Sequence, residues 1–221
     1  MMKYKAAIFD LDGTLLNSID DLADSCNNAL EKLGFPTHTI ECYKVFVGDG
    51  MRKLVERSLP EDSRDEETLA KCFAEMREQY SRAWAVKSKP YAGILEMLKK
   101  LEQTGMKLAV LSNKPDDFTK LCVDRFLQEI EFTIVCGVCP DRPAKPDPTG
   151  ALAIANEFGV APKDIIYLGD TNTDMQTANT AGMFAVGAIW GFRTKSELEE
   201  FGAHKTIEHP SEFICLAKGS E

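Results

Sequence analysis

The sequence predicts an α/β protein, in which a doubly wound parallel sheet of the Rossmann-like kind carries an inserted all-helical domain. Three observations predict this class. Short apolar runs alternate with helical patterns after residue 90, as they do in proteins built from strand–helix–strand units. A similar apolar run, Ala6–Phe9, lies near the start of the chain. Between these regions, residues 17–87 show helical periodicity and no convincing strand, which indicates a core of residues 1–16 and 88–221 with an insertion of residues 17–87.

The first elements follow from hydrophobic periodicity. The run Ala6–Phe9 is apolar on both faces, which is typical of a buried parallel strand. Apolar residues at 3.6-residue spacing then predict a helix over 19–33, which Asn17 or Ser18 can cap and Gly34 can end. Three more helices are expected in the insertion, at 39–46, 51–59 and 65–87.

The second half of the chain predicts the rest of the sheet. Strands are expected at 107–111, 132–136, 165–168 and 184–189, and helices near 93–104, 116–127, 149–158 and 173–181. Ligands of doubly wound sheets bind beyond the carboxyl ends of the strands. Chemically active residues are therefore expected just after each strand.

Polar residues do follow four of these segments. They are Asp10-Leu11-Asp12-Gly13-Thr14, Ser112-Asn113-Lys114, Lys145-Pro146 and Gly169-Asp170 with Asp174. Four carboxylates in one cleft repel one another unless they are neutralised, and a hard cation such as Mg²⁺ with oxygen ligands does this. A lysine in such a site indicates that the substrate brings negative charge. The combination predicts phosphoryl transfer.

The residue types also suggest a division of labour. Asp10 and Asp12, two positions apart at a strand end, share a face, so one can attack phosphorus while the other handles a proton. The hydroxyl of Ser112 and the backbone N–H of Asn113, expected at a helix start, suit a phosphate oxygen.

The amino-acid composition disfavours several classes of binding partner. The chain has 35 acidic and 26 basic residues, a formal charge of −9. This balance disfavours nucleic acid and anionic membrane surfaces, and no apolar run is long enough for a transmembrane helix. We expect a small phosphorylated metabolite as the partner, a cytoplasmic location, and a monomer or homodimer. The seven scattered cysteines fit a reducing compartment, and the pair Cys136 and Cys139 is read as structural because a zinc site needs four ligands.

The motifs, taken in order, resemble those of phosphatases of the haloacid dehalogenase superfamily, most closely the phosphoglycolate phosphatase-like branch. The motifs that carry the resemblance are Asp10-Leu11-Asp12-Gly13-Thr14-Leu15, Leu111-Ser112-Asn113, Lys145-Pro146-Asp147-Pro148 and Gly169-Asp170 with Asp174. The resemblance implies that residues 17–87 form the small helical cap of that family. It also implies that the segment 46–52 is a loop lowered over the active site.

The resemblance assigns roles to individual residues. It implies that Asp10 is the nucleophile that becomes an aspartyl-phosphate and that Asp12 is the general acid and base. The implied Mg²⁺ ligands are Asp10, the backbone carbonyl of Asp12 and Asp170, with Asp174 a ligand or the partner of one. The implied phosphate- and substrate-binding residues are Ser112, Asn113, Lys145, Thr14 as a supporting residue, and Arg52 for a substrate carboxylate.

These expectations leave several functions open. The first hypothesis is a Mg²⁺-dependent phosphatase acting on a small phosphomonoester, 2-phosphoglycolate above all. A sugar phosphomutase resembling β-phosphoglucomutase and an inorganic pyrophosphatase are the alternatives, because the core motifs do not separate them. A non-catalytic phosphate-binding module is the least favoured, since Asp10 and Asp12 are both present.

Overall fold

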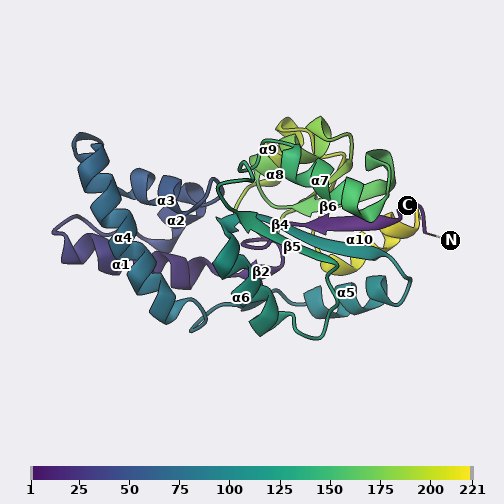
Figure 1. Ribbon diagram of the computed structural model, residues 1–221, viewed down its shortest axis with the longest axis horizontal. Helices are drawn as coiled ribbons and strands as arrows, with labels where there is room; N and C mark the ends of the chain where they lie inside the picture. The colour runs from purple at the N-terminus through teal and green to yellow at the C-terminus, as the bar shows by residue number, and fades with distance from the viewer. Residues whose placement is uncertain (1, 220–221) are drawn as a thin grey trace.

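The computed structural model describes residues 2–219 and contains a six-stranded parallel sheet with helices on both faces (Figure 1). The strand order is β5-β4-β1-β6-β7-β8. The bounds are β1 (Ala6–Phe9), β4 (Lys107–Pro115), β5 (Ile134–Val138), β6 (Ile165–Gly169), β7 (Phe184–Ala188) and β8 (Lys205–Ile207). From β1 the chain adds β4 and then β5 on one side. It then returns to pair β6 with the other side of β1, and adds β7 and β8 beyond β6. The reversal makes the carboxyl end of β1 the expected ligand site.

Alternating side chains of β1 divide the core into two layers. Ala7 and Phe9 join the cluster beneath α5 (Ile94–Glu102), α6 (Asp116–Phe126) and α10 (Pro210–Lys218). Ala6 and Ile8 join the opposite cluster, beneath α7 (Thr149–Phe158), α8 (Asn172–Thr180) and α9 (Lys195–Glu200). All four residues are fully buried. This arrangement confirms the predicted doubly wound α/β class.

The insertion folds as four helices at one end of the molecule, left of the sheet in Figure 1. They are α1 (Ile19–Lys32), α2 (Ile40–Phe46), α3 (Met51–Ser58) and α4 (Glu66–Ala83), and we call them the helical unit. They share a hydrophobic cluster, to which α4 contributes Leu69, Met76 and Tyr80 at helical spacing and α6 of the core contributes Phe118. The assignment of residues 17–87 to a separate domain stays a prediction.

The two segments that join the helical unit to the sheet run side by side. β2 (Leu16–Asn17) pairs antiparallel with β3 (Lys89–Pro90). The buried carboxylate of Asp21 reinforces the junction, because it accepts hydrogen bonds from the backbone N–H groups of Lys87 and Ser88 at 2.8–3.0 Å. The two chain connections between the helical unit and the core therefore lie side by side.

Some predicted bounds were wrong. β4 continues to Pro115, four residues beyond its expected end, and α4 ends at Ala83 rather than at 87. The sequence analysis also missed β8, α9 and α10. The first two are short and largely polar, whereas α10 buries Phe213, Ile214 and Ala217. The start of α10 did carry a signal, since Pro210 stands at its first position and Glu212 completes a capping box with His209.

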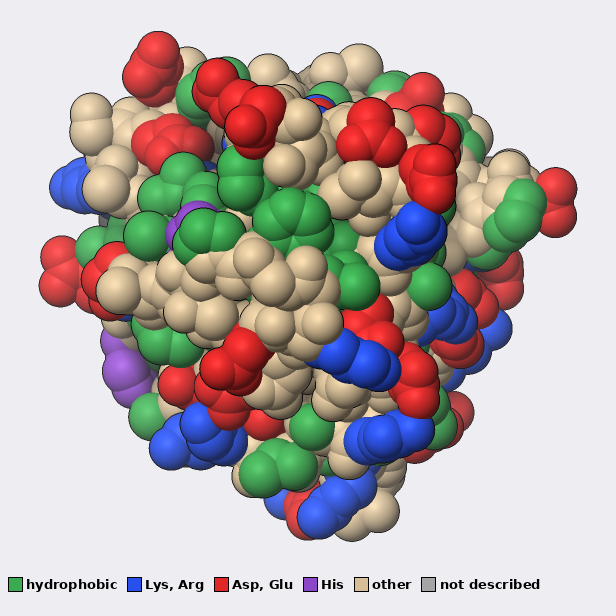
Figure 2. Space-filling model, turned by 90° about the vertical axis from the view of Figure 1, so that its left-hand side faces the viewer, with side chains coloured by type: hydrophobic (Ala, Val, Ile, Leu, Met, Phe, Trp, Pro, Cys, Tyr) green, Lys and Arg blue, Asp and Glu red, His purple; other side chains and the backbone are tan. Residues whose placement is uncertain are grey.

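Figure 2 shows the molecule from the end formed by the helical unit. Acidic and basic side chains are interspersed there, with hydrophobic ones between them. Within residues 2–219, no helix is long and apolar enough to cross a membrane.

Candidate active site

The strand-end residues meet at the carboxyl edge of β1, β4 and β6. An irregularity in β4 shapes this edge, because Leu111 pairs with Cys136 and Pro115 with Val138. Residues 112–114 therefore bulge opposite Gly137 alone. At Gly137 a Cβ would lie 2.5 Å from backbone atoms of β4 and α6, so only glycine fits. The bulge places Ser112, Asn113 and Lys114 beside the residues that follow β1.

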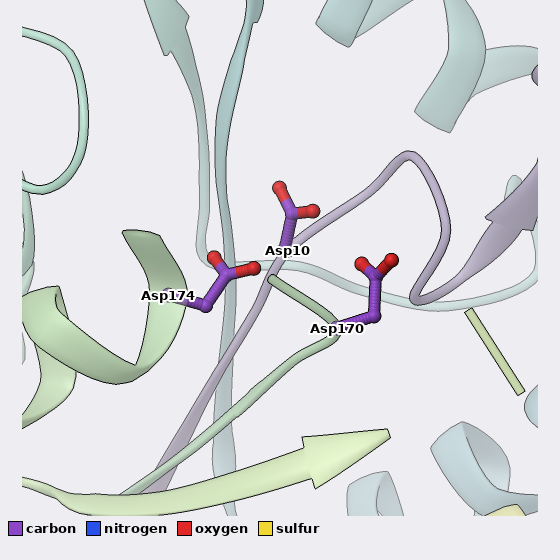
Figure 3. Close-up of side chains that lie close together, drawn as sticks. All are labelled: Asp10, Asp170 and Asp174. Carbon is purple, nitrogen blue, oxygen red and sulfur yellow. The ribbon is translucent and has the colours of Figure 1, made fainter. Parts of the chain in front are cut away.

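Three carboxylates converge beyond the strands, as Figure 3 shows. Asp10 follows β1, Asp170 follows β6 and Asp174 lies in the first turn of α8. Each offers an oxygen within 4.8 Å of the others, and all three are buried. Carboxylate oxygens are the ligands that a hard divalent cation prefers, so this set fits Mg²⁺.

Neighbouring groups fix the orientation of these carboxylates. The Thr14 hydroxyl donates to Asp170 Oδ1 at 2.7 Å, and the backbone N–H of Phe192 donates to Oδ2 at 2.8 Å. A Cβ at Gly13 or Gly191 would approach the side chain of Asp170 to 2.3 Å, so both positions need glycine. Asp170 is therefore held in place before any cation binds.

Asp174 is held by the start of its own helix. Its Oδ2 accepts hydrogen bonds from the backbone N–H of Thr171 at 3.1 Å and from the Thr171 hydroxyl at 2.7 Å, in a capping box. Its Oδ1 accepts from Tyr167 and Lys145.

Lys145 joins two of the carboxylates. Its Nζ lies 2.6 Å from Asp10 Oδ1, 2.7 Å from Asp174 Oδ1 and 3.0 Å from the carbonyl oxygen of Leu111. The three donors of the buried ammonium are thus all used. The side chain of Asn113 positions this lysine, since it accepts from the backbone N–H of Lys145 at 2.7 Å and donates to its carbonyl oxygen at 3.0 Å.

Asn113 also contacts the helical unit. Its amide donates to the carbonyl oxygen of Gly48 at 2.9 Å, in the loop expected to cover the site. Arg193, which follows β7, donates to the carbonyl oxygens of Val45 and Val47 at 3.2 and 2.6 Å. The loop therefore lies over the strand ends. Sequence reasoning missed Arg193, because nothing in its local pattern marks it.

Asp12 has two partners that the motifs do not include. The Ser18 hydroxyl donates to Asp12 Oδ1 at 2.5 Å, and Lys114 Nζ lies 2.9 and 3.0 Å from the two Asp12 oxygens. Ser18 does occupy the N-cap of α1, but its hydroxyl binds Asp12 instead of capping the helix. Sequence reasoning gave Lys114 no role, because the strand was expected to end at Leu111 and β4 in fact continues through the buried Lys114 to Pro115.

A cavity lies between these residues and the helical unit. Its core side is lined by Asp10, Asp12, Ser112, Asn113, Lys114 and Pro115. Its other side is lined by Leu22, Val47, Gly48, Gly50, Met51 and Leu54. One wall is thus charged and polar, and the other is apolar apart from backbone groups.

The charges in this region do not balance. Asp10, Asp12, Asp170 and Asp174 face the two ammonium groups of Lys114 and Lys145, which leaves two negative charges when all four carboxylates are ionised. Burial raises the pKa of Asp10 to about 7, although Lys145 opposes the rise. Burial and the Asp10 carboxylate raise the pKa of Asp170 well above its usual range. One divalent cation would offset the excess charge.

The comparisons with known proteins decide the family. The model of the family described as haloacid dehalogenase-like hydrolase matches residues 7–188. The chain belongs to this family. A phosphoglycolate phosphatase from Thiobacillus denitrificans is 33% identical over 220 residues, 97% of this chain and 96% of that protein. One from Aquifex aeolicus is 30% identical over 214 residues, 96% of each chain.

A similar solved structure supports the same family. A crystal structure from Lactobacillus delbrueckii subsp. bulgaricus, which carries a provisional assignment as a phosphoglycolate phosphatase, superposes with a TM-score of 0.93 at 29% identity. The match covers 99% of this chain and all of the other. The predicted family is confirmed. The predicted enzyme class, a phosphoric monoester hydrolase similar to phosphoglycolate phosphatases, is confirmed as well.

Three predicted site residues of this haloacid dehalogenase-like hydrolase lie elsewhere than expected. Ser112 and Asn113 belong to β4 rather than to a helix start, since α6 begins only at Asp116. The Ser112 hydroxyl still lines the cavity. Arg52 does not, because its guanidinium pairs with Glu66 on the exposed side of α3 at 2.7 and 2.8 Å. The structure therefore does not place Arg52 at the cavity.

Metal removal should destabilise this haloacid dehalogenase-like hydrolase increasingly as pH rises. The carboxyl of Asp10 titrates near 3.8 when unperturbed and near 7 in the metal-free fold, so the unfolded chain loses its proton first. Stability of the metal-free protein therefore falls between these pH values, and a cation that binds the ionised form restores it. We expect a Mg²⁺ concentration about 100 times the Kd at pH 7.5 to raise Tm by about 5–10 °C at that pH, and the same concentration to raise it by less at pH 5.

Calorimetry with Mg²⁺ or with EDTA measures this difference. Asp170→Asn is the matched control, because it removes one carboxylate of the cluster and should abolish most of the Mg²⁺ effect. An equal Tm shift at both pH values would contradict the expectation.

Proposed function

We propose that this enzyme is a Mg²⁺-dependent phosphatase that hydrolyses a small phosphomonoester, 2-phosphoglycolate above all, through an aspartyl-phosphate on Asp10. The observation that carries the proposal is the placement of Asp10. Its Oδ1 is bound by Lys145, and the structure gives its Oδ2 no hydrogen-bond donor among residues 2–219. The residue also lines the cavity beside Asp12. A fixed carboxylate with one free oxygen is suited to attack phosphorus.

Four groups would hold the metal. They are the side chains of Asp10, Asp170 and Asp174 and the backbone carbonyl of Asp12, of which the three side chains form the cluster described above. When bound, Mg²⁺ would neutralise negative charge on the phosphoryl oxygens. Lys145 would contribute a further positive charge from the protein beside Asp10.

The reaction then needs two displacements. An oxygen of Asp10 forms a bond to phosphorus while the bond to the leaving oxygen breaks, and Asp12 gives that oxygen a proton. Asp12 next takes a proton from water, whose oxygen bonds to phosphorus and releases Asp10 and phosphate. Ser18 and Lys114 orient Asp12 for both steps.

The cavity supports a small substrate. The helical unit gives it the side chains of Leu22, Val47, Met51 and Leu54, none of which can hydrogen-bond the hydroxyl groups of a sugar. A site that must bind a polyol needs such partners, because buried hydroxyl groups without them are costly. The relatives named phosphoglycolate phosphatase support the same choice.

A panel of substrates tests the proposal. We expect 2-phosphoglycolate to give a higher kcat/KM than glucose 1-phosphate or pyrophosphate, and chelation of Mg²⁺ to reduce turnover at least about 100-fold. Phosphate release is the readout. Conversion of a sugar phosphate that depends on a bisphosphate activator would replace hydrolase by mutase, and a preference for pyrophosphate would favour a pyrophosphatase.

A further inference from the structure

Lys114 is a buried cation to which the motifs described above assign no role. It is 5% exposed, and its Nζ contacts both oxygens of Asp12 and lies 4.8 Å from the centroid of the Tyr80 ring. Within residues 2–219, Asp12 is the one carboxylate that this ammonium contacts. Tyr80 lies on α4 and is fully buried, so the helical unit covers the ammonium from one side. The cavity lies on another side.

Lys114 is also the one cationic side chain among the described residues that line the cavity. Lys145 is engaged by Asp10, Asp174 and a carbonyl oxygen, and Arg52 pairs with Glu66 on the exterior. The opposite wall is apolar. A second anionic group on a molecule in this cavity therefore has Lys114 as its cationic partner, and an unpaired anion there would be costly.

We infer that Lys114 determines substrate specificity by binding the carboxylate of a short phosphorylated hydroxy acid. The inference rests on the proposed function, since it names the partner of the substrate's second anion in the same site. Because the same ammonium contacts Asp12, a carboxylate bound there brings the leaving oxygen of a two-carbon ester close to the Asp12 side chain. An ester with a neutral group in place of the carboxylate lacks this attachment.

Two esters of similar size test the inference. They are 2-phosphoglycolate and 2-hydroxyethyl phosphate, in which a hydroxymethyl group replaces the carboxylate. We expect the wild-type enzyme with Mg²⁺ to prefer 2-phosphoglycolate in kcat/KM, and Lys114→Met to reduce that preference about 10- to 100-fold, chiefly through KM. Lys114→Arg keeps the charge and should retain part of the preference. Lys120→Met removes an exposed charge from α6 and should leave it unchanged.

A structural role alone gives a different result. If Lys114 serves only to orient Asp12, Lys114→Met lowers kcat for both esters equally and keeps their ratio, which would overturn the inference while the proposed function stands. If Lys114→Met fails to fold, the wild-type enzyme decides. Glycolate should then inhibit hydrolysis of 2-hydroxyethyl phosphate competitively and ethylene glycol should not, and equal behaviour of the two would overturn the inference. Failure of the wild type to hydrolyse any ester would instead refute the proposed function.

Discussion

Replacing Asp10 by asparagine should reduce kcat for 2-phosphoglycolate at least about 10⁴-fold, because the amide cannot act as the nucleophile. The side chain keeps its shape, and its Oδ1 can still accept the hydrogen bond from Lys145 that the carboxylate accepts at 2.6 Å. Steady-state phosphate release in the presence of Mg²⁺ measures the loss. Near-native activity in this variant would refute the aspartyl-phosphate mechanism.

Two controls separate lost chemistry from lost folding. The circular dichroism spectrum of Asp10→Asn should match that of the wild type, since one buried carboxylate among several is removed without a change of volume. Asp147→Asn alters an exposed aspartate in the loop after Lys145 and should leave kcat within about twofold of wild type. Comparable losses in both variants would show that the effect is not specific to Asp10.

Replacing Lys145 by methionine should lower both activity and stability. Methionine keeps most of the volume but leaves Asp10 and Asp174 without the ammonium that now lies 2.6 and 2.7 Å from them. Removing one partner of a buried ion pair costs about 3–5 kcal/mol, equivalent to a fall in Tm of about 6–20 °C for a chain of this size. We expect kcat/KM to fall about 10³-fold, because a fixed positive charge beside the transferring group is lost.

The effect of Mg²⁺ on the Lys145→Met variant separates its loss of stability from its loss of activity. Mg²⁺ should recover part of the Tm of Lys145→Met, since it also offsets the carboxylates, but it should not restore turnover. Lys100→Met is the surface control, because Lys100 pairs with Glu96 on the exposed side of α5. Its effect on stability should stay within about 0.5 kcal/mol. If Lys145→Met were as stable as this control without metal, the charge balance derived for the site would be wrong.

The sequence predicted the convergence of the site but not its inner contacts. Asp10, Asp170 and Lys145 could be placed together, because the carboxyl ends of neighbouring parallel strands share one edge. The contact between Lys114 and Asp12 could not, since it depends on the bulge that carries β4 past Leu111. Periodicity gives the length of a strand but does not reveal a local change of register.

The misplacement of Arg52 has a similar cause. Its position next to the covering loop suggested a contact with substrate, but successive residues of an α-helix point about 100° apart. Met51 faces the cavity, whereas Arg52 points outward to Glu66. The direction of a helix face is fixed by packing within the helical unit, which a single motif cannot show. The sequence offered Asn17 or Ser18 as the cap of α1; Ser18 occupies the N-cap position, but its hydroxyl binds Asp12.

The pairing of β2 with β3 has a consequence for how this architecture can be altered. Asn17 and Lys89 are direct partners across that short ladder, so the chain leaves the sheet layer and re-enters it at neighbouring points. Adjacent strand ends of this kind can be joined by a hairpin turn. The predicted division of the chain would make the helical unit an insertion into the α/β core at this one junction. Insertions of other sizes could replace the helical unit at the same junction without changing the strand order of the sheet.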